Sequence, residues 1–102
     1  MVRELEYLEQ AVTEAEAAAR WYAERSLTAA ARFSVELDEA EAAIVERPEA
    51  WLLSDDGTRR YLLRRFPFSV VYRVEDARVV VVAIAHGRRR PGYWKGRSTR
   101  PA

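Results

Sequence analysis

The side chains that could carry out chemistry gather in the second half of the sequence, around a single histidine. His86 is the only histidine, and it stands where an apolar run ends and the arginines Arg88, Arg89 and Arg90 begin. An imidazole titrates near neutral pH and can act as a general acid. The alternative is a residue at the end of a strand that only bonds the backbone.

Further arginines precede this histidine at Arg64, Arg65 and Arg73. Guanidinium groups bind phosphate through paired hydrogen bonds, so these residues and Arg88–Arg90 are candidates for contacts with a phosphate-bearing target. Pairing with acidic helices is the alternative. Tyr93 could stack on a base or transfer a proton, or it could dock the end of the chain. The sequence shows no cysteine, metal-ligand cluster, glycine-rich phosphate loop or nucleophile triad, so we expect neither a metal nor a cofactor.

Three apolar runs must position these residues. They are Tyr61–Phe66, Phe68–Val74 and Val79–Ala85, and their Val, Tyr, Phe and Ile content is typical of strands. The breaks at Pro67 and Glu75–Arg78 are short enough to make neighbouring strands antiparallel, which predicts a three-stranded meander. Because Val79–Ala85 contains no polar residue, we expect it in the centre with both faces covered.

The first half of the chain predicts a strand and two helices. Residues 2–8 alternate weakly and favour a short edge strand, and residues 9–25 are alanine-rich with apolar side chains at helical spacing. Ser26 offers a capping hydroxyl for a second helix from about Ala29 to Glu46, which Pro48 stops. So short a connection predicts an antiparallel helical hairpin.

This order of elements predicts an α+β fold. An N-terminal edge strand precedes a two-helix antiparallel hairpin, which packs on one face of a small antiparallel sheet ending in the three-stranded meander. We expect one domain over residues 1–87 and a basic, partly ordered tail over residues 88–102, pinned where Tyr93 and Trp94 dock. The second face of the sheet mixes apolar and arginine side chains. No other part of the chain is expected to cover it, so a protein partner could.

The charge is divided unevenly along the chain. Residues 1–58 carry 14 acidic and 5 basic residues, whereas residues 59–102 carry 12 basic and 2 acidic residues. This asymmetry indicates a nucleic-acid or acidic protein partner for the basic half, or neutralisation between the two halves within the fold. No apolar run approaches the roughly 20 residues that span a bilayer, and the N-terminus lacks the blocks of a signal peptide. We therefore expect a cytoplasmic protein without membrane contact.

Several segments together resemble the RelE/ParE superfamily of toxins from type II toxin–antitoxin modules. They are EAEAAARWY at 14–22, AARF at 30–33, IVERP at 44–48, RRYLLRRFPFSVVYRV at 59–74 and AIAHGRRR at 83–90. The resemblance covers nearly the whole chain, and the last two segments are the more specific. It implies a growth-inhibiting protein that a cognate antitoxin holds inactive in a hetero-oligomer. It also supplies the partner for the uncovered face, with Trp21, Trp51, Tyr61, Leu63 and Val71 as candidate antitoxin contacts.

The superfamily divides by target. The RelE-like branch cleaves mRNA on the ribosome, and that alternative would use His86 to protonate the leaving 5′ oxygen, with Arg65, Arg73 and Tyr93 as further catalytic candidates. The ParE-like branch inhibits DNA gyrase. Two departures from the endonuclease pattern favour the ParE-like side. Ser69 stands where endonuclease relatives often carry a basic residue, and a lysine-based catalytic set is absent because the only lysine, Lys95, lies in the tail. A non-toxic nucleic-acid-binding module, using the basic tail on phosphates, is a further alternative.

Overall fold

The three apolar runs form the predicted meander. The computed structural model describes residues 4–99. The strands are β2 (Arg59–Leu62), β3 (Phe68–Glu75) and β4 (Arg78–His86), and β3 pairs antiparallel with both of the others. β2 ends four residues earlier than the apolar run suggests. The reason is that the backbone N–H groups of Arg64 and Arg65 donate to a carboxylate oxygen of Glu36, at 2.8 and 3.2 Å, instead of to a strand.

The N-terminal strand completes the sheet. β1 (Glu4–Tyr7) lies at one edge and pairs parallel with β4, which gives the strand order β1-β4-β3-β2. The edge position is confirmed, but the parallel pairing makes the sheet mixed and not wholly antiparallel. β4 therefore has a neighbour on each side, and residues 79–85 are all buried, which confirms the central place predicted for this run.

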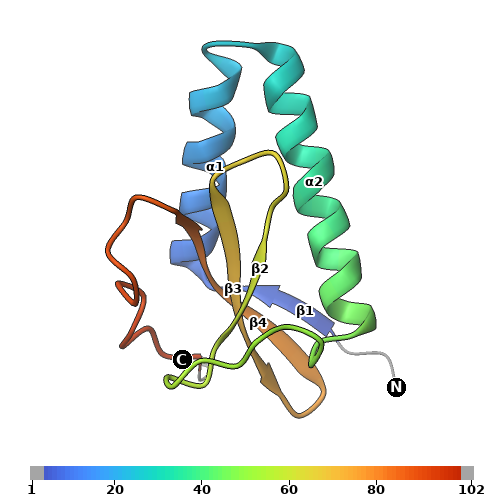
Figure 1. Ribbon diagram of the computed structural model, residues 1–102, viewed down its shortest axis with the longest axis vertical. Helices are drawn as coiled ribbons and strands as arrows, with labels where there is room; N and C mark the ends of the chain where they lie inside the picture. Colours follow the sequence, from blue (N-terminus) through green and yellow to red (C-terminus); the bar gives the residue numbers. More distant parts are fainter. Residues whose placement is uncertain (1–3, 100–102) are drawn as a thin grey trace.

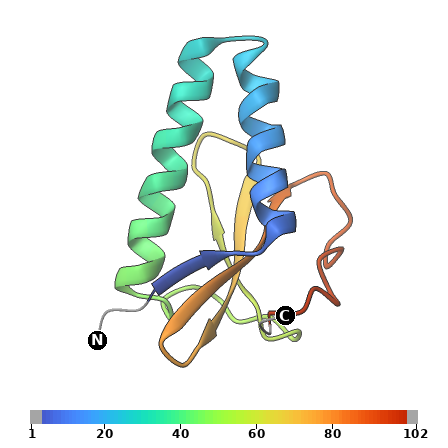
Figure 2. The ribbon, with the colours of Figure 1, turned by 180° about the vertical axis from the view of Figure 1, so that it is seen from behind.

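The two helices form a hairpin with a three-residue connection. α1 (Glu9–Ala23) and α2 (Leu27–Glu46) run side by side and extend beyond the sheet (Figures 1 and 2). Ser26 caps α2 by accepting the backbone N–H of Ala29 at 3.1 Å, as its hydroxyl predicts. Neither helix within residues 4–99 is long and apolar enough to cross a membrane.

The core has two parts, one on each face of the sheet. On the helical face, Phe33 and Ile44 of α2 pack with Val70, Tyr72 and other strand residues. On the opposite face, Trp94 is 5% exposed and packs with four strand residues, Val71, Val82, Ala83 and Ala85. The expectation that nothing in the chain covers this second face is therefore wrong, because the C-terminal segment lies across it.

Candidate functional site

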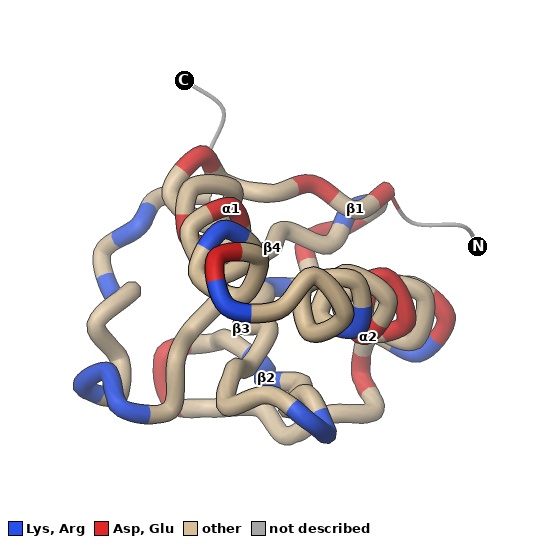
Figure 3. The backbone as a smooth tube through the Cα atoms, turned by 90° about the horizontal axis from the view of Figure 1, so that it is seen from above, with Lys and Arg blue, Asp and Glu red and all other residues tan. Residues whose placement is uncertain are grey.

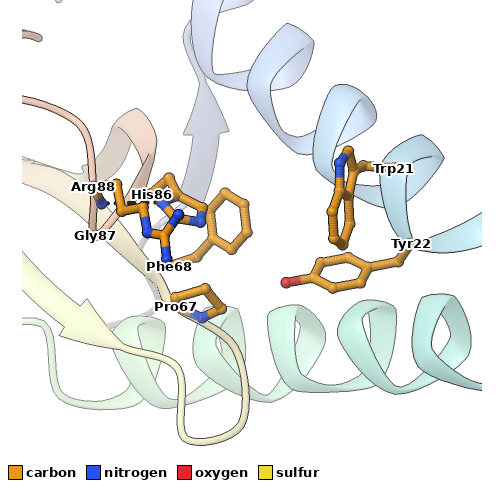
Figure 4. A pocket seen from close by; sticks show the side chains of 7 residues that line it. All are labelled: Trp21, Tyr22, Pro67, Phe68, His86, Gly87 and Arg88. Carbon is orange, nitrogen blue, oxygen red and sulfur yellow. Dashed lines mark hydrogen bonds between the residues drawn. The ribbon is translucent and has the colours of Figure 1, made fainter. Parts of the chain in front are cut away.

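His86 lies at the end of β4, in the wall of a pocket. Its ring stands edge-on to Phe68, with 5.0 Å between ring centroids, and its Nδ1 accepts the backbone N–H of Arg88 at 3.0 Å. The pocket measures about 500 Å³ and lies between the C-terminal end of α1 and the ends of β3 and β4 (Figure 4). We call it the His86 pocket. Its lining residues are Trp21, Tyr22, Pro67, Phe68, His86, Gly87 and Arg88.

The structure does not assemble the predicted catalytic candidates around His86. Of the candidate arginines only Arg88 shares its pocket, while Arg65 lines a separate pocket beside α2. Arg73 acts electrostatically on Asp56, and Tyr93 bonds Glu14 on α1. A histidine that accepts a backbone N–H is the alternative that the sequence left open, and the observed bond to Arg88 fits it.

The other arginines divide between paired and exposed positions. Arg64 forms a 3.5 Å ion pair with Glu39 of α2, and both side chains are mostly exposed. Arg89 places its guanidinium 3.9 Å from the centre of the Tyr93 ring. Arg88, Arg89 and Arg90 are all exposed, so this cluster remains accessible to an anionic partner. Figure 3 shows acidic residues along α2, the helix whose Glu39 pairs with Arg64.

Glu14 of α1 binds the C-terminal segment, a role that sequence reasoning missed. Its carboxylate accepts the Tyr93 hydroxyl at 2.7 Å, two guanidinium N–H groups of Arg97 and the backbone N–H of Ile84 at 3.0 Å. Burial by itself would raise the pKa of Glu14, but these hydrogen bonds lower it below its ordinary value. Burial and the Glu14 carboxylate raise the pKa of Tyr93 to about 12. The only sequence signal was the opposite charge of the two halves.

A second carboxylate fixes Trp94. The indole Nε1–H donates to Asp56 Oδ2 at 3.0 Å, while Oδ1 of the same carboxylate accepts the backbone N–H and hydroxyl of Thr58. Burial would raise the pKa of Asp56, yet the bonds from Thr58 and Trp94 and the nearby Arg73 lower it. Docking of Tyr93 and Trp94 is thus confirmed, and it connects the C-terminal segment to both α1 and the loop before β2.

The residues expected to contact an antitoxin lie in different surroundings. Trp21 is 51% exposed, and Trp51 packs against Tyr61 with 4.9 Å between ring centroids. Leu63 is 7% exposed and Val71 is fully buried. Leu63 is covered by the core of the helical face, and Val71 is covered by Trp94.

Among residues 4–99, no group of three or more histidine, aspartate or glutamate side chains could hold a metal ion.

Comparison with known proteins identifies the family. The family described as "ParE toxin of type II toxin-antitoxin system, parDE" matches residues 5–91. A solved structure titled "Chromosomal ParDE TA system from P. aeruginosa" has a similar fold, with a TM-score of 0.72 and 19% identity over 83% of this chain and 96% of that chain. No curated protein matches. The family match extends over most of the chain and includes both helices, strands β2 to β4 and all of β1 except Glu4. The chain belongs to the ParE toxin family of type II toxin–antitoxin systems.

Proposed function

We propose that the chain arrests growth by inhibiting DNA gyrase and that a cognate antitoxin neutralises it in the cytoplasm. The observation that carries this proposal is membership of the ParE family over residues 5–91. A protein that inhibits its target by binding needs a surface that is complementary to that target. It does not need a general acid and a general base.

The positions of the polar side chains support binding as the mode of action. Ser69, where a basic residue would favour a nuclease, lies on β3 opposite Ala85. Tyr93 is held by Glu14 and has a raised pKa, so it is a poor proton donor or acceptor near neutral pH. His86 therefore has no second proton-transferring side chain among the candidates that the sequence offered.

The proposed antitoxin has apolar side chains on the surface to bind. Exposed large apolar residues are concentrated on the helical hairpin and around β2, where they are available to a partner. They are Val12, Trp21, Leu27, Val35, Leu52, Leu53 and Leu62. Of the antitoxin contacts expected from the sequence, we retain Trp21, Trp51 and Tyr61 in the proposal.

A second candidate function rests on the His86 pocket. His86 and Arg88 line the same cavity, so a ribosome-dependent endoribonuclease could use the imidazole as an acid and the guanidinium on phosphate. This candidate predicts that His86→Ala abolishes toxicity while antitoxin binding survives.

Supercoiling of relaxed plasmid by purified gyrase tests the proposal directly. We expect the purified chain to inhibit supercoiling, and His86→Ala to inhibit it equally well, because the imidazole takes no part. Unchanged supercoiling, together with cleavage of mRNA on translating ribosomes by the original chain but not by His86→Ala, would replace gyrase inhibition by the endoribonuclease function.

A further inference from the structure

The His86 pocket has the form of a binding site for a bulky side chain. Its walls come from two separate parts of the fold, with Trp21 and Tyr22 on α1 and Phe68 and His86 on the strands (Figure 4). A volume of about 500 Å³ falls within the range of cavities that bind small ligands. Aromatic rings therefore face the cavity from both sides, and an aromatic occupant would contact rings on each.

Trp21 is already held in position at this opening. Its ring stands edge-on to Tyr22, with 5.1 Å between centroids, and the guanidinium of Arg25 lies 3.8 Å from its centroid. Yet Trp21 remains 51% exposed. A fixed, half-exposed tryptophan beside a cavity is the kind of residue that dominates protein–protein binding energy, because little rotational freedom is lost when a partner covers it.

The residues that line the His86 pocket include a positive charge and no negative charge. Arg88 and His86 are the ionisable lining residues besides Tyr22, and none of the seven lining residues is acidic. Arg25 adds a second guanidinium on the Trp21 ring. Because His86 Nδ1 accepts a backbone N–H, the neutral imidazole carries its proton on Nε2 and can donate a hydrogen bond. The pocket thus combines apolar walls with donors and positive charge.

We propose that the His86 pocket binds an acidic peptide segment, which inserts an aromatic side chain between Trp21 and His86 and places a carboxylate near Arg88. The inference deepens the proposed function and rests on it for the identity of the natural occupant, which would be a segment of the antitoxin. The binding chemistry itself follows from the pocket. A nucleic-acid strand fits less well, since only one arginine lines the cavity and a strand needs successive phosphate contacts.

The single histidine makes the pocket directly observable by NMR, because His86 gives the only imidazole signals of the chain. The probe is the blocked peptide Ac-Glu-Phe-Glu-NH2. The comparison ligands are Ac-Lys-Phe-Lys-NH2, Ac-Glu-Ala-Glu-NH2 and uridine monophosphate. We expect the acidic aromatic peptide to shift the His86 signals saturably and each comparison ligand to bind at least about tenfold more weakly.

Two variants, each with a matched control, place the binding in this pocket. Trp21→Ala and Arg88→Glu are expected to weaken the acidic peptide at least about tenfold. The controls are Thr28→Ala and Arg32→Glu, which change exposed side chains of α2 outside the pocket and should leave the affinity unchanged. Because Trp21 and Arg88 are both substantially exposed, their variants should fold, which the dispersion of the NMR spectrum checks.

The proposal is overturned by absence of a saturable shift, by equal binding of the lysine peptide, by tighter binding of the nucleotide, or by controls that lose affinity like the pocket variants. These outcomes are separate from the gyrase assay. If the chain binds the peptide but does not inhibit gyrase, the proposed target is wrong and the binding site stands. If the chain inhibits gyrase but does not bind the peptide, the binding site is wrong and the proposed target stands.

Discussion

The carboxylate of Glu14 binds the guanidinium of Arg97 through both of its oxygens. Nη1 of Arg97 lies 3.1 Å from Oε1 and Nη2 lies 3.0 Å from Oε2, and the two side chains are only 16% and 17% exposed. Arg97 also donates to the backbone carbonyl of Val82 on β4 at 2.9 Å. One ion pair thus joins α1, β4 and the C-terminal segment, which makes that segment part of the folded structure.

Removing either member of this pair should destabilise the protein. Glu14→Ala leaves the Arg97 charge without its carboxylate partner and the Ile84 N–H without its acceptor, so we expect a loss of about 2–4 kcal/mol in the free energy of unfolding. Denaturant unfolding of Glu14→Ala, Arg97→Ala and the double variant should give a coupling energy of about 1–3 kcal/mol.

The exposed pair of Arg64 and Glu39 is the matched control for that cycle. Its side chains are 78% and 53% exposed, and its atoms are 3.5 Å apart. Arg64→Ala should therefore change the free energy of unfolding by no more than about 0.5 kcal/mol. Equal losses at the two pairs would mean that the Glu14 network does not anchor the C-terminal segment.

Glu14 should also make stability depend on acid pH. Its pKa is lower in the folded state than its ordinary value of 4.5, so its contribution is present above the unfolded-state pKa and lost as pH falls through the folded-state pKa. Measured from neutrality to about pH 2, the difference in free energy of unfolding between the original chain and Glu14→Gln should shrink. A difference that stays constant across this range would contradict the assignment.

Tyr93 should act in the opposite pH range. Its pKa is raised from 10.0 to about 12, so its contribution to stability is complete below the unfolded-state value and lost as pH rises through about 12. Tyr93→Phe removes one hydrogen bond to Glu14 and should cost about 1 kcal/mol at neutral pH, with a smaller difference at strongly alkaline pH. Titration of both proteins, followed by the near-ultraviolet absorbance of tyrosinate, checks this. The part of the signal that is missing in Tyr93→Phe should appear near pH 12 in the original chain. A Tyr93 that ionises near pH 10 would argue against the bond.

Trp94 and Trp21 offer a comparison of one substitution in two environments. Trp94→Ala empties a buried site over four strand residues and should cost about 3–5 kcal/mol. Trp21→Ala changes a half-exposed side chain and should cost about 1 kcal/mol or less. Chemical denaturation of the two variants tests this. If both cost the same, Trp94 is not part of the core.

Local sequence patterns predict the helices and strands, whereas the end of β2 and the position of the C-terminal segment depend on contacts between residues far apart in the chain. The uninterrupted apolar run at 79–85 marks a central strand, because only a strand covered on both faces excludes polar side chains over that length. The early end of β2 depends on Glu36, a helical residue 28 positions before Arg64. Glu14 and Arg97 are 83 positions apart. Neither pairing has a local signature, and charge asymmetry alone does not say which residues meet.

Local sequence patterns likewise identify only part of the His86 pocket. His86 and Arg88 were evident as candidates because they adjoin the end of an apolar run. Trp21 could not be placed beside them, since its position depends on how the helical hairpin packs against β3 and β4. The buried state of Val71 was likewise unpredictable, because the side chain that covers it lies more than 20 residues further along the chain, in a segment without hydrophobic periodicity.

Pulse-labelling of DNA and protein synthesis, in cells immediately after expression of this chain without its antitoxin, distinguishes gyrase from the ribosome as the target. If the chain inhibits gyrase, DNA synthesis should fall first, and His86→Ala should behave in the same way. If protein synthesis falls first and His86→Ala is harmless, gyrase is not the target and His86 is the centre of a nuclease site.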